Sequence, residues 1–145
     1  MSNAVVVLPT LAYDRIDTVL IVVHAAKPPS DSDWNRLMRE PLVATKGCIV
    51  VAGATKLDAK KRRLLAENVK NLDIKVAVLV SSSVARGIVT ALGWLVGGYR
   101  AFAMNELEQA AAYVGLPTAR AADVQRVVRE LQLELAGRKS QAAER

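Results

Sequence analysis

One stretch decides the fold: Lys75-Val76-Ala77-Val78-Leu79-Val80, followed by Ser81-Ser82-Ser83 and a long apolar segment. A continuous run of apolar, largely β-branched residues is typical of a strand that is buried on both faces. The three serines offer N-caps for a helix over residues 84–96, which Gly97-Gly98 closes. A buried strand that leads directly into a helix is the repeating unit of an α/β protein with a largely parallel sheet.

The same alternation continues on both sides of this stretch. Apolar or β-branched runs predict strands at 5–8, 15–23, 47–53, 75–80 and 99–103. Helices are expected after the caps at 30–33, after the capping-type pattern at 55–58, and over 84–96, 105–114 and 121–136. The sequence therefore predicts an α/β fold: a single mixed, mostly parallel sheet of about five strands with helices packed on it, and an extra C-terminal helix.

Length and composition favour one domain. The 145 residues are 52% hydrophobic and 23% charged, and we expect a domain over 4–136 followed by a frayed polar tail at 137–145. The single cysteine, Cys48, excludes an internal disulfide and a cysteine-based metal site. The longest apolar stretch, 84–98, contains Arg86 and several glycines and is too short to span a bilayer. We therefore expect a cytoplasmic protein without a membrane span, metal or cofactor.

The net charge of +6 permits an anionic partner. Much of the excess lies in two basic clusters on predicted helices, for which a solvated outer face is the ordinary explanation. These clusters are Lys56, Lys60, Lys61, Arg62 and Arg63, and Arg120, Arg126, Arg129, Arg138 and Lys139. Neither contains interleaved aromatic residues for base stacking, so nucleic acid is not the expected partner.

Four local patterns resemble the SpoIIAA-like branch of the STAS fold. They are Lys75-Val76-Ala77-Val78-Leu79-Val80-Ser81-Ser82, then Gly87-Ile88-Val89-Thr90-Ala91-Leu92, then Arg100-Ala101-Phe102, and Glu108-Gln109-Ala110-Ala111-Ala112-Tyr113-Val114. The resemblance covers about residues 4–116 and implies a non-enzymatic module that binds signalling proteins, is sometimes switched by phosphorylation, and in some branches holds apolar ligands. The family's phosphorylated tandem serines are absent from the corresponding stretch, Gly53-Ala54-Thr55-Lys56-Leu57, so only Thr55 carries over.

The leading hypothesis is a protein-interaction module, with homodimerisation open as an alternative. The two helix starts near Thr55 and Ser81–Ser83 follow neighbouring strands, and the carboxyl ends of parallel strands meet at one edge of a sheet. A phosphate on Thr55 would lie at the positive end of a helix, but the ordinary explanation of a threonine at this position is that it simply caps the helix. The candidate binding residues are Thr55, Lys56, Lys60, Ser81, Ser82, Ser83, Arg86 and Trp94.

A second hypothesis is a binding protein for a small apolar or anionic ligand. The segment 84–96 has little polar face, so the last helix, a second subunit or an apolar ligand beside Trp94 must cover it. An anion could instead bind at the helix start formed by Ser81–Ser83.

Catalysis has little support from the sequence. His24 is the only histidine, it ends a predicted strand, and it has no evident orienting partner. Cys48 lies within an apolar strand, where a thiol is an inert small hydrophobe. We therefore expect no enzymatic activity and no catalytic residue.

Overall fold

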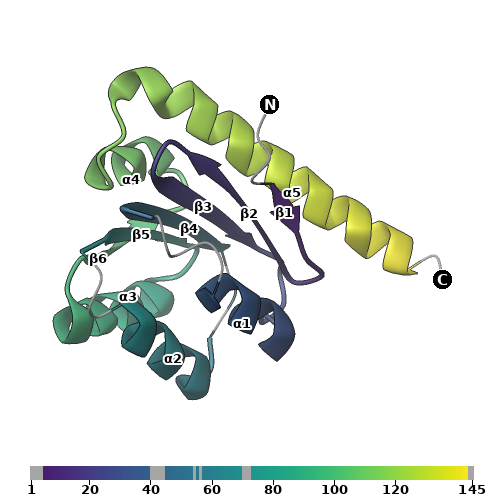
Figure 1. Ribbon diagram of the computed structural model, residues 1–145, viewed down its shortest axis with the longest axis horizontal. Coiled ribbons are helices and arrows are strands. Elements are labelled where there is room, and N and C mark those ends of the chain that lie inside the picture. The colour runs from purple at the N-terminus through teal and green to yellow at the C-terminus, as the bar shows by residue number, and fades with distance from the viewer. Residues whose placement is uncertain (1–4, 40–44, 54, 56, 70–72, 144–145) are drawn as a thin grey trace.

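The computed structural model describes residues 5–39, 45–53, 55, 57–69 and 73–143. Its centre is one six-stranded sheet in the order β1-β2-β3-β4-β5-β6 (Figure 1). The strands are β1 (Val6–Val7), β2 (Leu11–Ile16), β3 (Val19–His24), β4 (Gly47–Gly53), β5 (Lys75–Val80) and β6 (Tyr99–Ala103). The first two pairings are antiparallel and the other three are parallel, which confirms the predicted mixed α/β sheet.

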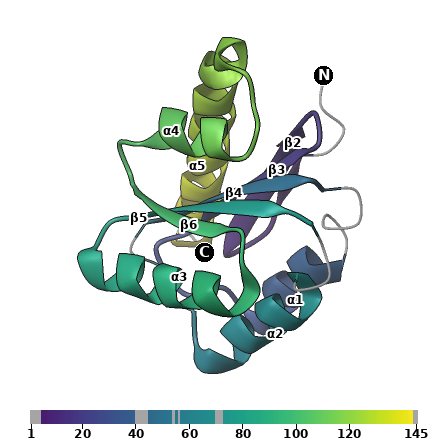
Figure 2. The same ribbon diagram turned by 90° about the vertical axis from the view of Figure 1, so that its left-hand side faces the viewer.

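Helices cover both faces of the sheet (Figure 2). One face carries α1 (Asp31–Arg39), α2 (Ala59–Val69) and α3 (Ser83–Val96). The opposite face carries α4 (Leu107–Tyr113) and α5 (Ala121–Ala143), which a 3₁₀ turn at Thr118–Arg120 connects. Because α5 packs on the face opposite α3, the last helix is excluded as the cover for 84–96.

The strand expected at 15–23 is divided between β2 and β3. Ile16 pairs with Val19 across a tight turn at Asp17-Thr18, and Asp17 has a φ of 55°. Aspartate tolerates this left-handed conformation better than most residues, because its short polar side chain bonds locally. The turn was missed because neither glycine nor proline marks it, and the sheet has six strands instead of about five.

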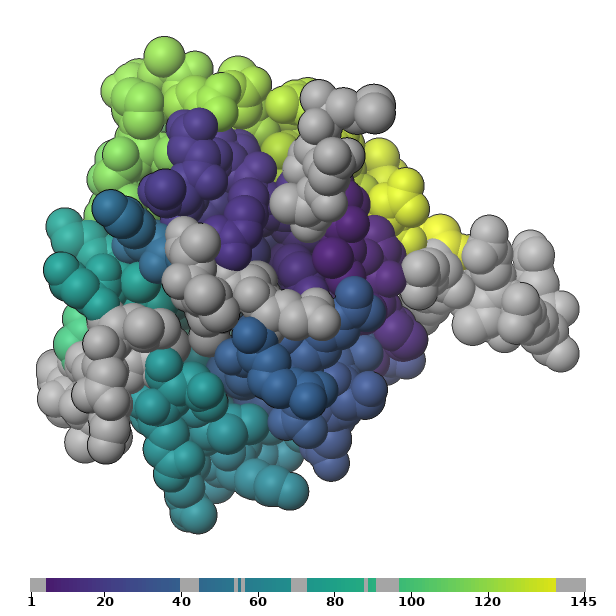
Figure 3. All heavy atoms as spheres, in the orientation of Figure 1, coloured from purple at the N-terminus to yellow at the C-terminus, as the bar shows by residue number. Residues whose placement is uncertain are grey.

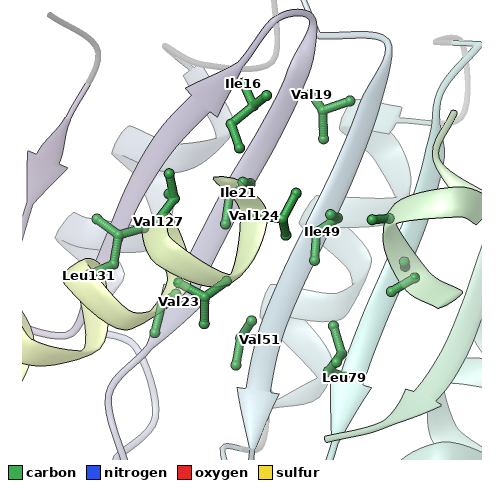
Figure 4. Close-up of a cluster of buried hydrophobic side chains, with 14 of the residues drawn as sticks. Ile16, Val19, Ile21, Val23, Ile49, Val51, Leu79, Val124, Val127 and Leu131 are labelled. Atoms are coloured by element: carbon green, nitrogen blue, oxygen red, sulfur yellow. The ribbon is translucent and has the colours of Figure 1, made fainter. Parts of the chain in front are cut away.

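The face under α4 and α5 is fully packed. Alternate residues of β2 to β6 point to this side, and the apolar stripe of α5 lies across them, as the spacing of its valines and leucines predicts. Figure 4 shows Val124, Val127 and Leu131 of α5 against Ile21 and Val23 of β3. The helix does not fray at Gly137 as expected but continues to Ala143.

The other face holds the second core. Its sheet residues include Leu20, Val22, Val76 and Val78, and Trp34, Leu37 and Met38 of α1 pack against them as predicted. Ser30 caps α1, because its Oγ accepts a hydrogen bond of 3.2 Å from the Asp33 backbone N–H. None of the helices in the described part of the chain is both long and apolar enough to cross a bilayer.

Candidate ligand cavity

A cavity of about 200 Å³ lies in the second core, between the sheet and the helices α1, α2 and α3. Its lining is chiefly aliphatic, with Leu20, Val22, Val76, Val78 and Val80 from the strands and Leu37, Met38, Leu65, Ala85 and Val89 from the helices. Six side chains with polar or titratable groups also reach it: His24, Trp34, Cys48, Thr55, Arg62 and Tyr99. The cavity is therefore an apolar space with a few defined polar groups, which is the usual composition of a small-molecule site.

His24 and Trp34 meet at one end of this cavity. Their ring centroids are 6.1 Å apart and the rings are inclined by 32°. His24 as a residue is half-buried, but its Nδ1 atom is buried, and neither this atom nor Trp34 Nε1 has a hydrogen-bond partner among the described residues. Burial lowers the pKa of His24 to about 4, so the imidazole is neutral at pH 7.

Tyr99 lies at the other end, at the start of β6. Strand register aligns it with Leu20, Cys48 and Val76 in one row across the sheet. Its hydroxyl is buried and has no partner within the described ranges, and burial raises its pKa above the ordinary value. Burial also raises the pKa of the Cys48 thiol to about 12, so that very little of the reactive thiolate is present at neutral pH and any alkylation is slow.

Most of the buried polar atoms that lack a hydrogen-bond partner belong to residues of the cavity lining. In the described part of the chain, four buried side-chain nitrogen or oxygen atoms lack a hydrogen-bond partner, and three of them belong to residues that line the cavity. The fourth, Arg120 Nε, belongs to the α5 side of the molecule. Since buried polar groups are almost always paired, this concentration marks the cavity as unusual.

Thr55 lines the cavity but does not cap α2. Its hydroxyl is buried and donates to the backbone carbonyl of Ala25, just after β3. The helix begins at Ala59, and Asp58 caps it by accepting a hydrogen bond of 2.8 Å from the Lys61 N–H. The expected Thr55 cap is thus wrong, because the aspartate directly before the helix takes that role.

The second predicted helix start lies at the same edge of the sheet. The Ser81 N–H donates to the Gly53 carbonyl (2.9 Å), and Ser82 caps α3 by accepting a 3.1 Å bond from the Ala85 N–H. The connections after β4 and β5 are therefore adjacent, as expected. The side chains of the remaining candidates Lys60, Ser83 and Arg86 are exposed to solvent.

Two other candidates are not placed. Lys56 lies outside the described residues, and so does the side chain of Trp94, although its backbone belongs to α3.

The first basic cluster is only partly a solvated face. Lys61 Nζ lies 2.8 Å from Asp31 Oδ1 and 3.1 Å from Asp58 Oδ2, with its side chain only 10% exposed. This pairing joins α1 to α2, which lie side by side in the space-filling view (Figure 3). Arg62 is half-buried, donates from Nη1 to the Leu57 carbonyl, and lines the cavity.

The sequence suggested an apolar ligand beside the helix 84–96, and Ala85 and Val89 of this helix do line the cavity, but most of the other lining residues were not candidates. His24 was considered only for catalysis and Arg62 only as part of a solvated face, and neither Trp34 nor Tyr99 was among the candidate binding residues. The available signal was the position of His24 at the carboxyl end of a central strand, where ligands of α/β proteins bind.

Comparison with known proteins gives no identification. No protein-family model matches the chain, and no curated protein sequence matches it. Within the described ranges, no group of three or more His, Cys, Asp or Glu side chains is arranged to hold a metal ion.

Proposed function

We propose that this protein binds a small, chiefly apolar molecule in the cavity between the sheet and α1 to α3, and that it acts as a binding protein. The observation that carries the proposal is an apolar cavity whose lining includes His24, Trp34 and Tyr99, each with one buried nitrogen or oxygen atom that has no hydrogen-bond partner among the described residues. Each unsatisfied buried polar group costs about 1–3 kcal/mol. A ligand that bonds to these atoms, after a small shift of the side chains that carry them, would recover much of that cost.

The size of the cavity limits the ligand. An apolar cavity of roughly 150 Å³ stays dry and holds one benzene molecule. The cavity here, at about 200 Å³, accepts a slightly larger body. Aliphatic walls favour hydrocarbon, while the indole N–H offers a donor to an acceptor group on the ligand.

Mass spectrometry and two built-in probes test the proposal. Native mass spectrometry of freshly purified protein should show an adduct that denaturation releases. Cys48 is the only cysteine and lines the cavity, so its slow alkylation by a small apolar maleimide should become slower still when ligand is bound. A Trp94→Phe variant leaves Trp34 as the only tryptophan, and its fluorescence should change saturably with cyclohexanol, 1-octanol or octanoate, none of which emits in the tryptophan range.

A cavity-filling variant provides the control. Val78→Phe places a ring in the cavity, and Val78→Leu is a milder change should the larger residue impair folding. We expect either variant to weaken binding of every probe. A clean apo mass, together with unsaturable fluorescence and unchanged Cys48 alkylation in the presence of all three probes, would overturn the proposal.

A second candidate function is a cytoplasmic STAS-like protein-interaction module. The resemblance in sequence supports it, and so does the exposed segment at the start of α3, where Val84 is 72% exposed. Phosphorylation at Thr55 would require the buried hydroxyl to leave the Ala25 carbonyl. A Val84→Asp variant should lose a partner that the wild type captures from native extract, and unchanged capture would count against this surface.

A further inference from the structure

We infer that the ligand carries a single carboxylate, which Arg62 binds at the carboxyl edge of the parallel strands, and an apolar tail that extends toward Tyr99 and Cys48. This inference rests on the proposed function and specifies its ligand. The charge of the lining residues is the first argument. Among the described residues that line the cavity, Arg62 is the only one that is charged at pH 7, because His24 is neutral there.

Arg62 has no counter-ion among the described residues. Its neighbour Lys61 pairs with two aspartates, but no carboxylate in the described part of the chain pairs with Arg62. The one hydrogen bond of its side chain within the described structure, from Nη1 to the Leu57 carbonyl, holds the guanidinium beside a residue that also lines the cavity. A half-buried guanidinium beside apolar walls gains most from a partner that supplies negative charge and planar acceptors, and a carboxylate supplies both.

The polar side chains of the lining, apart from Tyr99 and Cys48, belong to one end of the cavity. The bond from Thr55 to the Ala25 carbonyl fixes the β4–α2 connection beside the end of β3, where His24 lies. Leu57, which holds Arg62, is two residues further along this connection. The pair Lys61–Asp31 joins the first turns of α2 and α1, and Trp34 follows on the next turn of α1. Arg62, Trp34 and His24 therefore belong to the same end of the lining, which we assign to the headgroup.

The tail end lies deeper along the strands. Leu20, Cys48, Val76 and Tyr99 form one row across the sheet, and His24 is four residues beyond Leu20 on β3. Four residues of a strand span ~13 Å, which suits an elongated tail better than a compact ring. The apolar side chains between these rows have no charge that would favour a second ionised group on the ligand.

Octanoate and 1-octanol have the same chain length but different headgroups, so a comparison of their binding isolates the contribution of the carboxylate. At pH 7.5 we expect wild-type protein to bind octanoate at least tenfold more tightly than 1-octanol. Arg62→Gln should weaken octanoate binding at least tenfold and leave 1-octanol binding within twofold. The matched control is Arg63→Gln, which removes the same charge from an exposed neighbour and should bind both probes as wild type does.

Further variants and probes complete the test. Arg62→Lys keeps the charge without the planar fork and should retain part of the preference for octanoate, which covers the case that Arg62→Gln is poorly folded. Octyl phosphate binding more tightly than octanoate, or equal binding of octanoate by wild type and Arg62→Gln, would overturn the carboxylate inference. In that case continued binding of 1-octanol would leave the proposed function standing, while failure of every probe would remove both.

Discussion

The imidazole of His24 faces the indole of Trp34 at a centroid separation of 6.1 Å, and a buried nitrogen of each ring lacks a partner among the described residues. Both rings sit where β3 ends and α1 begins its first turns. The pair therefore combines an apolar contact with two unused polar atoms, an arrangement that costs stability unless something bonds to them. Its energetic consequences can be measured without knowledge of the ligand.

The first prediction concerns acid stability. The pKa of His24 is lowered by burial from 6.5 to about 4, so between these pH values the unfolded chain binds a proton that the folded chain does not. The free energy of unfolding should therefore fall as the pH is lowered through this window, by on the order of 3 kcal/mol in all. Urea denaturation between pH 7.5 and 4.5 measures this loss.

A His24→Gln variant is the control for this effect. Glutamine has no titration in this range, and His24 is the only histidine in the chain. We expect the variant to lose little stability between pH 6.5 and 4.5, apart from the contribution of carboxylates at the acid end. If the free energy of unfolding fell equally with pH in the variant and in the wild type, the loss could not be attributed to His24.

The second prediction compares two tyrosines. Tyr99 OH is buried without a partner in the described structure, whereas Tyr113 OH donates to the Gly98 carbonyl at 2.8 Å. Removing an unsatisfied hydroxyl should be neutral or stabilising by about 1 kcal/mol, while removing a bonded one should cost about 0.5–1 kcal/mol. Thermal denaturation should thus show a loss of stability for Tyr113→Phe and no loss, or a gain, for Tyr99→Phe, and a larger loss for Tyr99→Phe would show that its hydroxyl is bonded.

The third prediction concerns the link between α1 and α2. Lys61 pairs with Asp31 and Asp58, whereas Lys60, one position earlier, is exposed. Replacement by methionine keeps most of the apolar stem, so Lys61→Met tests the charge. We expect it to cost about 1 kcal/mol at low salt and less at 1 M salt, with Lys60→Met close to wild type at both.

The pH dependence of this link has a defined sign. Hydrogen bonds and charge from Lys61 lower the pKa of Asp31 and of Asp58 below the ordinary 3.8. The stabilisation is therefore present above pH 4 and is lost as the carboxylates are protonated at lower pH. Equal stability of Lys61→Met and Lys60→Met at pH 7 and low salt would contradict the role of this pairing.

The sequence predicted those helices and strands in which the spacing of apolar residues shows which side chains are buried. The stripe that includes Val124, Val127 and Leu131 gave the packing face of α5, and the continuous apolar run at 75–80 gave the central strand β5. The turn at Asp17-Thr18 escaped prediction because alternation continues through it and only the backbone conformation of Asp17 marks it.

The cavity could not be predicted in the same way. Its volume depends on how the side chains of three helices together fill the space over the sheet, and no short stretch of sequence determines this combined packing. The sequence did predict that the β4 and β5 connections meet at one edge, which the bond from Ser81 to Gly53 confirms. Nothing in the sequence indicated the role of Arg62, because the whole basic run that contains it was predicted to be exposed to solvent.

The last prediction concerns the glycine before Tyr99. Gly98 has a φ of 75°, and a Cβ added there would lie 2.7 Å from the Ile74 carbonyl oxygen. Gly98→Ala therefore forces a strained backbone and displaces Ile74, whose side chain lines the cavity. We expect a loss of about 1–3 kcal/mol and weaker binding of the cavity probes.

Gly87 provides the matched substitution. It lies within α3, and a Cβ there would meet no described atom within 4 Å. Gly87→Ala should stabilise the protein by about 0.5–1 kcal/mol, because alanine loses less backbone entropy in a helix, and should leave probe binding unchanged. Urea denaturation of both variants measures the contrast. A Gly98→Ala protein as stable as Gly87→Ala would mean that the β6 start and Ile74 can move freely, and the cavity would then lack the fixed wall that selective binding needs.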